Sequence, residues 1–337
     1  MTKPHKEVVV SGMRPTGKLH LGHFFGVLKN WRELQKNYIC YFFVADWHSL
    51  TTEYAQTEVI QKSITDIVID WLAAGINPDQ AVLFVQSQVP EHAELHLLLS
   101  MITPLSWLER VPSYKELKQE NKIKDLSTYG FLGYPLLQTS DVAIYKAKHI
   151  PVGQDQVAHI ELAREIIRRF AHLYSTNILL EPRALLTQGA KILGTDGRKM
   201  SKSYDNCVYL SDSVETAHKK FMAYITDPQR MRRQDPGNPD VCPIYGFHQL
   251  VTPLGQVEEI NKGCRSAAIG CVDCKKNLLT HLNASLEEFR DKRKALEKNP
   301  KVVYDILKEG SLKASKVAAA TLREVRSAMG MEGYASK

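Results

Sequence analysis

Two histidines at the start of a predicted helix stand in a setting that suits a phosphate. His20 and His23 follow a strand-like run and a Gly-rich turn at residues 11–17. At a spacing of three residues, both imidazoles lie on one face of the first helical turn. Backbone N–H groups and the helix dipole at such a turn favour an anion. We therefore predict a phosphate site there, with Gly22 leaving room for a flat base to approach the backbone.

A second basic loop follows much later in the chain. The run Lys199-Met200-Ser201-Lys202-Ser203 comes shortly after Gly194 and Gly197. Its two ammonium groups can stabilise the charge of a transferring phosphoryl group. Neither loop matches the dinucleotide or the P-loop fingerprint. The alternative for the lysines is an ordinary basic surface loop. The alternative for the first motif is a surface helix whose histidines have no function.

Four of the six cysteines gather in a third constellation. Cys242, Cys264, Cys271 and Cys274 are separated by 21, 6 and 2 residues. Four thiolates suffice for a tetrahedral zinc ion or a 4Fe–4S cluster. The irregular spacing favours iron–sulfur over zinc, and four unrelated cysteines are the alternative. Basic residues that suit RNA phosphates flank the group: Lys262, Arg265, Lys275 and Lys276.

The elements that must position these residues alternate between strand and helix up to residue 205. Apolar runs predict strands at 7–11, 39–44, 81–85 and 149–152, and helical spacing predicts helices at 21–35, 58–74, 90–101, 112–122 and 155–172. This pattern predicts an α/β fold with a Rossmann-like, doubly wound parallel sheet over residues 1–205. Later helical spacing, at 214–224, 278–296, 302–307 and 312–329, predicts an α-helical domain over 206–337.

Length and composition agree with two globular domains. The chain has 337 residues, is 44% hydrophobic and carries a net charge of +7, which is compatible with nucleic acid without establishing it. No apolar run approaches the ~18 residues that a membrane helix needs. The N-terminal residues show no signal peptide. We therefore expect a cytoplasmic protein without membrane contact.

The two phosphate motifs together carry a resemblance. The H-x-G-H residues 20–23 and the K-M-S-K-S residues 199–203 resemble the signatures of class I aminoacyl-tRNA synthetases. The segments 14–17, 45–48, 134–141 and 151–156 are most similar to the bacterial tryptophanyl-tRNA synthetase family. The likeness covers essentially the whole chain and implies the HUP-type version of the fold. It implies that tryptophan and ATP form tryptophanyl-AMP and pyrophosphate, before transfer to tRNA(Trp).

The resemblance also implies a role for each residue that matches a family motif. The expected catalytic residues lie at the ATP phosphates and are His20, His23, Lys199 and Lys202. Mg²⁺ is expected to be bound mainly by the nucleotide. The expected ATP-binding residues are Arg14, Thr16, Gly22, Lys115, Gly153, Asp155, Lys199, Met200, Ser201 and Lys202. The expected tryptophan pocket contains His48, Tyr134, Gln138, Asp141, Ile150, Val152 and Gln156.

Within this pocket, Asp141 is expected to accept the indole N–H. An unpaired buried acceptor rejects side chains that lack that donor. By spacing alone, Asp141 would be an N-cap or a surface residue. Gln138 and Gln154 depart from the methionine and glutamate that many family members carry at these positions.

The four cysteines resemble those of a subset of bacterial tryptophanyl-tRNA synthetases that hold a 4Fe–4S cluster in the anticodon-binding domain; zinc is the alternative. The family also implies a homodimer, with residues 107–122 as a candidate contact region. The nearest competing function is a tyrosyl-tRNA synthetase. An RNA-binding paralogue that does not charge tRNA and a nucleotidylyltransferase of the wider fold are more distant alternatives.

Overall fold

A computed structural model describes residues 6–112, 126–186 and 192–331. Five strands form a sheet in the order β3-β2-β1-β4-β5, and all neighbouring strands are parallel. The strands are β1 (Val8–Met13), β2 (Ile39–Val44), β3 (Ala81–Val85), β4 (His149–Val152) and β5 (Arg183–Leu186). The α/β prediction is confirmed. The direction of the strand order changes between β1 and β4, and a ligand crevice is expected at the carboxyl ends there.

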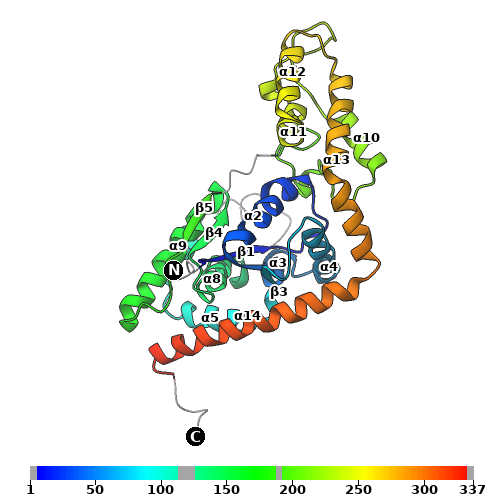
Figure 1. Cartoon of the computed structure of the whole chain (residues 1–337). Coiled ribbons are helices and arrows are strands. Elements are labelled where there is room, and N and C mark those ends of the chain that lie inside the picture. Colours follow the sequence, from blue (N-terminus) through cyan, green and yellow to red (C-terminus); the bar gives the residue numbers. More distant parts are fainter. Residues whose placement is uncertain (1–5, 113–125, 187–191, 332–337) are drawn as a thin grey trace, which may run out of the picture.

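Helices cover both faces of this sheet (Figure 1). They are α1 (Leu21–His23), the π-helical turn η1 (Phe24–Leu28), α2 (Lys29–Asn37), α3 (Asp46–Glu53), α4 (Thr57–Ala73), α5 (Glu91–Ser100), α6 (Leu105–Glu109), α8 (Tyr129–Ala143) and α9 (Val157–Tyr174). The short 3-10 turns are η2 (Gln86–Gln88), η3 (Gln154–Gln156) and η4 (Lys202–Tyr204). The helix predicted at 21–35 is therefore interrupted by a π-helical turn. The helix predicted at 112–122 lies almost entirely outside the described residues.

Alternate residues of the central strands point to opposite sides of the sheet. Val9 and Phe42 belong to a buried cluster that includes α2 and α4, whereas Val10 and Phe43 belong to a second cluster that includes α5, α8 and α9. On the first side, Trp31 stacks on Phe42 with ring centroids 4.2 Å apart. Both faces of the sheet are thus buried, as the continuous apolar run of β2 predicted.

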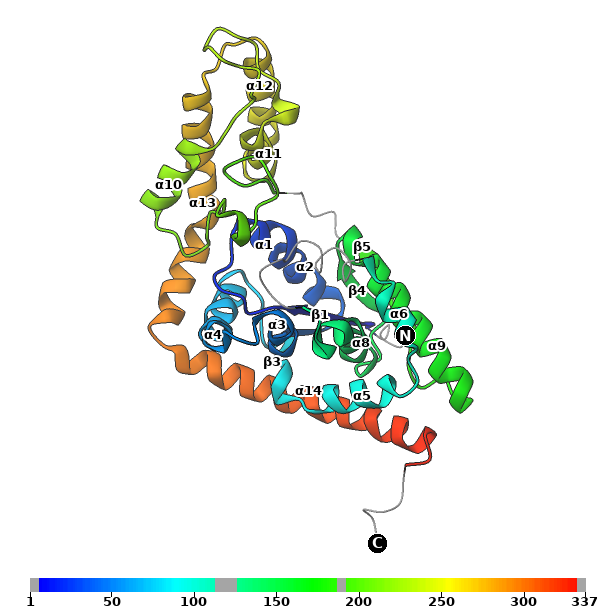
Figure 2. The same ribbon diagram turned by 180° about the vertical axis from the view of Figure 1, so that it is seen from behind.

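A helical arm extends away from the sheet (Figures 1 and 2). It contains α10 (Val214–Ala223), the turn η5 (Pro239–Val241), α11 (Pro243–Val251), α12 (Leu254–Arg265) and the first half of α13 (Cys271–Glu297). The second half of α13 packs against α4, next to the sheet. At this junction Phe24 meets Phe289 edge to face, with centroids 5.6 Å apart. One continuous helix therefore links the arm to the first phosphate motif.

The last helix, α14 (Pro300–Ala328), returns to the sheet and runs along β3. It is a single helix where the apolar spacing predicted two, at 302–307 and 312–329. Gly310 lies at the crossing, where an added Cβ would come within 1.8 Å of the Leu83 carbonyl oxygen. The domain boundary after residue 205 stays a prediction. Helix α14 belongs to the predicted second domain, residues 206–337, but it packs on the sheet of the first.

Among the described residues, the helices are too short or too polar to cross a membrane.

Candidate active site

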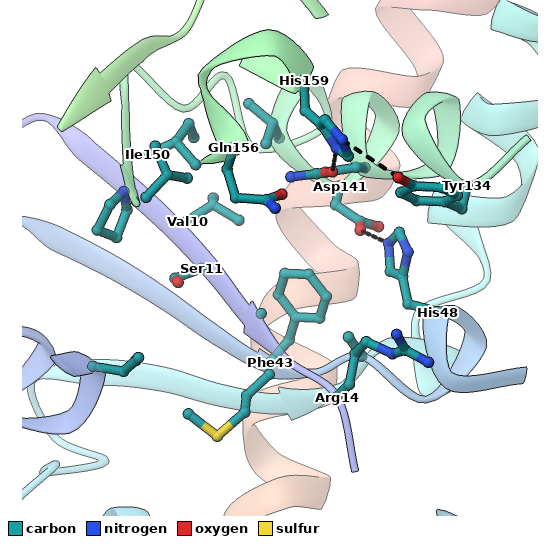
Figure 3. A pocket seen from close by; sticks show the side chains of 18 of the residues that line it. Val10, Ser11, Arg14, Phe43, His48, Tyr134, Asp141, Ile150, Gln156 and His159 are labelled. Carbon is teal, nitrogen blue, oxygen red and sulfur yellow. Dashed lines mark hydrogen bonds and ion pairs between the residues drawn. The ribbon is translucent and has the colours of Figure 1, made fainter. Parts of the chain in front are cut away.

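A cavity of about 570 Å³ opens at the carboxyl ends of β1 and β4, where the strand order changes direction. Figure 3 shows His48, Tyr134 and Asp141 gathered on one side of it, opposite Val10 and Ile150. Eleven of the predicted site residues line this cavity: Arg14, Thr16, His23, His48, Tyr134, Gln138, Asp141, Ile150, Val152, Gly153 and Gln156. The structure thus brings the two halves of the predicted site together.

The two histidines of the first motif cap their own helix. The backbone N–H of Gly22 donates to His20 Nδ1 at 3.1 Å, and the N–H of His20 donates to His23 Nδ1 at 3.2 Å. Because both Nδ1 atoms accept, each neutral ring carries its proton on Nε2. Burial lowers the pKa of His20 to about 4 and lowers the pKa of His23 well below its usual value. Both side chains are therefore neutral N–H donors at physiological pH.

The Gly22 position is tightly packed against its neighbour. An added Cβ there would lie 2.9 Å from the ring of His20. Only glycine at this position lets the His20 ring fold back over the helix start. This packing gives Gly22 a steric role besides the expected contact with adenine.

The second motif lies on a hairpin beside the first. Leu193 pairs with Lys199 in an antiparallel bridge, and Gly197 at φ +78° forms the turn. The buried Asn206 holds the loop: its Oδ1 accepts from the Ser201 N–H at 2.8 Å, and its Nδ2 donates to the Lys199 carbonyl at 3.2 Å. Met200 is buried, whereas the Lys199 side chain is exposed to solvent.

Lys202 joins the two motifs directly. Its ammonium group donates to the carbonyls of Thr16 at 3.0 Å and Gly17 at 2.9 Å, and burial lowers its pKa to about 8. The turn that carries His20 and the loop that carries Lys202 are therefore in contact. Of the three N–H donors that they carry, His23 lines the cavity, whereas His20 and Lys202 do not.

Asp141 is a buried carboxylate with donors on both oxygens. Its Oδ1 accepts from Gln86 Nε2 and from His92 Nδ1, each at 2.7 Å, and its Oδ2 accepts from His48 Nε2 at 2.8 Å. Burial alone would raise the pKa of Asp141, but the bonds from His48 and His92 outweigh it and hold that pKa below its usual value. The side chain is therefore an ionised acceptor at the wall of a pocket that both apolar and polar side chains line.

Gln138 is part of a second hydrogen-bonded chain. Its Oε1 accepts from His159 Nδ1 at 2.6 Å, and His159 Nε2 lies 3.4 Å from the Tyr134 hydroxyl. Burial lowers the pKa of His159 to about 4, so this ring is neutral and its Nε2 accepts from the phenol. The glutamine that departs from the family pattern is thus paired within the pocket wall.

The remaining predicted residues lie at the rim or beyond it. Gln156 Nε2 donates to Asp155 Oδ2 at 3.1 Å, and Asp155 is exposed next to Gly153. Arg14 bonds the Thr52 hydroxyl. Lys115 lies outside the described residues. Asp155 and the Lys199–Lys202 loop do not line the cavity itself.

Sequence reasoning missed several residues of this site. Phe43 and His159 line the cavity, and Gln86, His92 and Tyr145 lie behind Asp141. For Phe43 a signal existed, because alternate residues of a parallel strand face opposite sides. The other four depend on contacts between separate elements, which no spacing reveals.

The four cysteines all lie in the arm, on or next to three different helices. Cys242 precedes α11, Cys264 lies in α12, and Cys271 and Cys274 occupy the first turn of α13. Burial, together with a smaller contribution from the three other thiols, raises the pKa of Cys274 to about 12. Within residues 6–112, 126–186 and 192–331, no group of three or more His, Cys, Asp or Glu could hold a metal ion. The iron–sulfur cluster therefore stays a prediction.

One member of the predicted basic rim is not part of it. Lys275 is only 7% exposed, and its ammonium group donates to the carbonyls of Met222 at 2.8 Å and Tyr224 at 2.7 Å. Its charge is therefore used inside the arm, and the prediction for this residue is wrong. Arg265 is accessible but paired with Asp240 at 2.7 Å.

Comparison with known proteins shows the family to which the chain belongs. A family model described as tRNA synthetases class I (W and Y) matches residues 2–287. The tryptophan–tRNA ligase of Thermotoga maritima is 50% identical, and that of Aquifex aeolicus is 44% identical; each match covers 96% of this chain and 99% of the relative. The solved tryptophanyl-tRNA synthetase of Campylobacter jejuni, complexed with ADP and tryptophan, is 30% identical with a TM-score of 0.86, and the match covers 96% and 99% of the two chains.

The chain therefore belongs to the class I tRNA synthetases, the class that its parallel sheet and its two phosphate motifs define. Within this class it is a member of the tryptophan–tRNA ligase family. The predicted choice of tryptophan over tyrosine is confirmed at the level of the family.

Proposed function

We propose that the chain activates tryptophan with ATP to give tryptophanyl-AMP and pyrophosphate, and then transfers the tryptophanyl group to tRNA(Trp). The tryptophan carboxylate is already a nucleophile when it attacks the α-phosphorus. The enzyme must therefore position the two substrates and stabilise charge, and needs no strong general base. The neutral histidines and the single ionised Asp141 are consistent with this division of work.

At the ATP end, His20 and His23 offer their Nε2–H groups to the phosphates. Lys202 and Lys199 add positive charge from the second motif, with Met200 and Ser201 between them. Mg²⁺ arrives with the nucleotide and neutralises phosphate charge when bound. We assign the rest of the ATP contacts to Arg14, Thr16, Gly22, Lys115, Gly153 and Asp155.

At the tryptophan end, Asp141 accepts the indole N–H. The ring lies among Tyr134, Ile150 and Val152, and Gln156 near the rim receives the ammonium group. His48 and Gln138 complete the pocket from the wall. The observation that carries the proposal is the ionised, buried Asp141 in the cavity that His23 also lines.

ATP–pyrophosphate exchange with single amino acids tests this proposal. We expect exchange with tryptophan and none above background with tyrosine or phenylalanine, followed by charging of tRNA(Trp). Exchange driven by tyrosine alone would favour the tyrosyl-tRNA synthetase alternative. Binding of tRNA without exchange would favour the non-charging paralogue, and exchange without tRNA binding would favour the nucleotidylyltransferase.

We further propose that Cys242, Cys264, Cys271 and Cys274 hold a 4Fe–4S cluster that shapes the anticodon-binding surface. The four thiols are partly buried, and the other three help to raise the pKa of Cys274. Bound iron would relieve this repulsion between ionised thiols, which suits a metal group. A four-iron cluster attaches each cysteine to a separate iron and so needs a wider arrangement than one zinc ion. Visible absorption with iron in anaerobically purified protein supports the cluster; stoichiometric zinc instead would refute it.

A homodimer is the proposed assembly, and the cytoplasm the proposed compartment. Apolar side chains stand exposed on neighbouring segments at the start of α8, on and directly after α5, and on α6: Leu97 (52%), Met101 (69%), Leu105 (58%) and Tyr129 (68%). A second copy of the chain would cover such a patch. Light scattering should give twice the 38.1 kDa chain mass, and Met101→Glu should shift the protein toward monomer.

A further inference from the structure

The two oxygens of Asp141 have different surroundings. Oδ1 accepts from Gln86 and His92, which are both fully buried and do not line the cavity. Oδ2 accepts from His48, which does line it. A carboxylate oxygen has two lone-pair positions in its plane. Oδ1 therefore has no acceptor position left. Oδ2 keeps one, because among the described residues His48 is its donor (Figure 3).

His92 is itself fixed from behind. Its Nε2 lies 2.7 Å from the hydroxyl of Tyr145, a buried residue whose pKa is raised well above its usual value by burial. The phenol therefore stays protonated and donates to Nε2. This leaves the ring proton on Nδ1, the atom that faces Asp141. Tyr145 is held in turn by stacking on Tyr41, with centroids 4.3 Å apart.

Gln86 is oriented by the same carboxylate. Its Nε2 donates to Asp141, while its buried Oε1 has no partner among the described residues. A flipped amide would place its oxygen against the carboxylate. The bond to Asp141 thus decides the orientation of Gln86. Gln86 and His92 therefore both donate to Oδ1.

We propose that His92 is a positioning residue for substrate specificity: held by Tyr145, it saturates Oδ1 together with Gln86 and leaves Oδ2 as the single acceptor for the substrate ring N–H. This inference rests on the proposed function. His92 does not touch the substrate. It acts by preventing Asp141 from rotating about its side chain and by keeping the second oxygen from competing for the donor.

A tryptophan analogue without the indole N–H distinguishes a role of His92 in positioning Asp141 from a general effect on the stability of the enzyme. In β-(benzothienyl)alanine, sulfur replaces the indole N–H while the ring size is nearly kept. The measurement is kcat/KM in ATP–pyrophosphate exchange for tryptophan and for this analogue. The test variants are His92→Leu, which removes the donor, and Tyr145→Phe, which removes only the hydroxyl. His92→Asn is the matched control, because its amide N–H can replace Nδ1–H.

The proposal predicts a selective loss. A hydrogen bond to a charged group is worth roughly 10- to 100-fold, so we expect His92→Leu to lower the tryptophan-to-analogue ratio by about 10-fold or more. Tyr145→Phe should lower that ratio by a few fold, and His92→Asn should restore most of it. The KM for ATP should stay near the wild-type value in all three variants.

Equal losses for both substrates, or an unchanged ratio, would overturn the positioning role. If His92→Leu does not fold, Tyr145→Phe decides: a lower ratio supports the proposal and an unchanged ratio refutes it. A wild-type enzyme that exchanges with tryptophan but does not prefer it over the analogue would refute recognition through Asp141. A wild-type enzyme that does not exchange with tryptophan would refute the proposed function itself.

Discussion

The ammonium group of Lys202 donates a hydrogen bond of 2.9 Å to the carbonyl of Gly17, 185 residues earlier in the chain. This bond and the one to Thr16 connect the loop of the second phosphate motif to the turn that precedes the first. The arrangement also places the Lys202 charge in a partly dehydrated setting, and this burial has a consequence for the pH dependence of ATP use.

Because burial lowers the pKa of Lys202 to about 8, the free enzyme should lose this positive charge as the pH rises above 8. We expect kcat/KM for ATP to fall with an alkaline limb near pH 8, since this parameter reports the free enzyme. In Lys202→Arg the limb should disappear, because a guanidinium stays charged. An unchanged limb in Lys202→Arg would assign it to another group.

A second prediction separates the two roles of His20. Asparagine is a strong N-cap, so His20→Asn should still accept the Gly22 N–H and keep the helix start. It lacks the Nε2–H that we assign to the phosphates, and kcat for exchange should fall by roughly 100-fold or more. His20→Ala should show the same kcat loss and also cost about 1 kcal/mol in stability. Wild-type kcat in His20→Asn would contradict the phosphate role.

The junction between α13 and α4 depends on a buried arginine. Arg293 Nη2 lies 2.5 Å from Asp66 Oδ1 and 3.1 Å from Glu297 Oε1, and its Nη1 bonds the buried Asp70. Arg293→Met leaves Asp70 without its cation, which should cost about 3–5 kcal/mol in urea unfolding. The exposed pair of Lys292 with Glu288 is the control, and Lys292→Met should cost less than about 1 kcal/mol. Equal losses would show that Arg293 does not anchor the junction.

The contact between α14 and β3 can be tested with an alanine scan of glycines. Gly310→Ala would force a Cβ to within 1.8 Å of the Leu83 carbonyl oxygen, so the helix must shift and stability should fall. Gly246 in α11 is the matched control, since nothing lies within 4 Å of its added Cβ. Gly246→Ala should raise stability by up to about 1 kcal/mol. Thermal unfolding that shows no difference between the variants would contradict the close approach.

The sequence predicted the sheet better than the helices around it. Four strands were predicted because β1 to β4 carry apolar runs, whereas β5 begins with Arg183 and contains no fully buried residue. The break predicted within α14 reflects Gly310 and Ser311, which usually interrupt a helix. Here they are buried where α14 crosses β3, and tertiary packing overrides their low helix propensity.

The residues of the site that belong to short sequence motifs could be predicted, and those that only the fold brings together could not. The two phosphate motifs follow from residue types and spacing, and Asp141 follows from the resemblance that these motifs carry. Gln86, His92 and Tyr145 lie in three separate segments that meet only in the fold. Lys275 is different, because the sequence did contain a pattern that indicates its burial. It lies three residues before Leu278 and four before Leu279, on the buried face of α13, so its burial could have been predicted from helical spacing.

The central claim, that Asp141 recognises the indole N–H, is tested most directly by ATP–pyrophosphate exchange with Asp141→Asn. This change keeps the size of the side chain and removes its charge. Because Gln86 and His92 both donate to the Oδ1 position, the amide oxygen of asparagine should lie there and its NH2 group should replace Oδ2. We predict that kcat/KM for tryptophan falls by about 100-fold, as expected for loss of the acceptor that binds a buried donor, while the KM for ATP stays near the wild-type value. A kcat/KM for tryptophan equal to that of the wild type would contradict the claim.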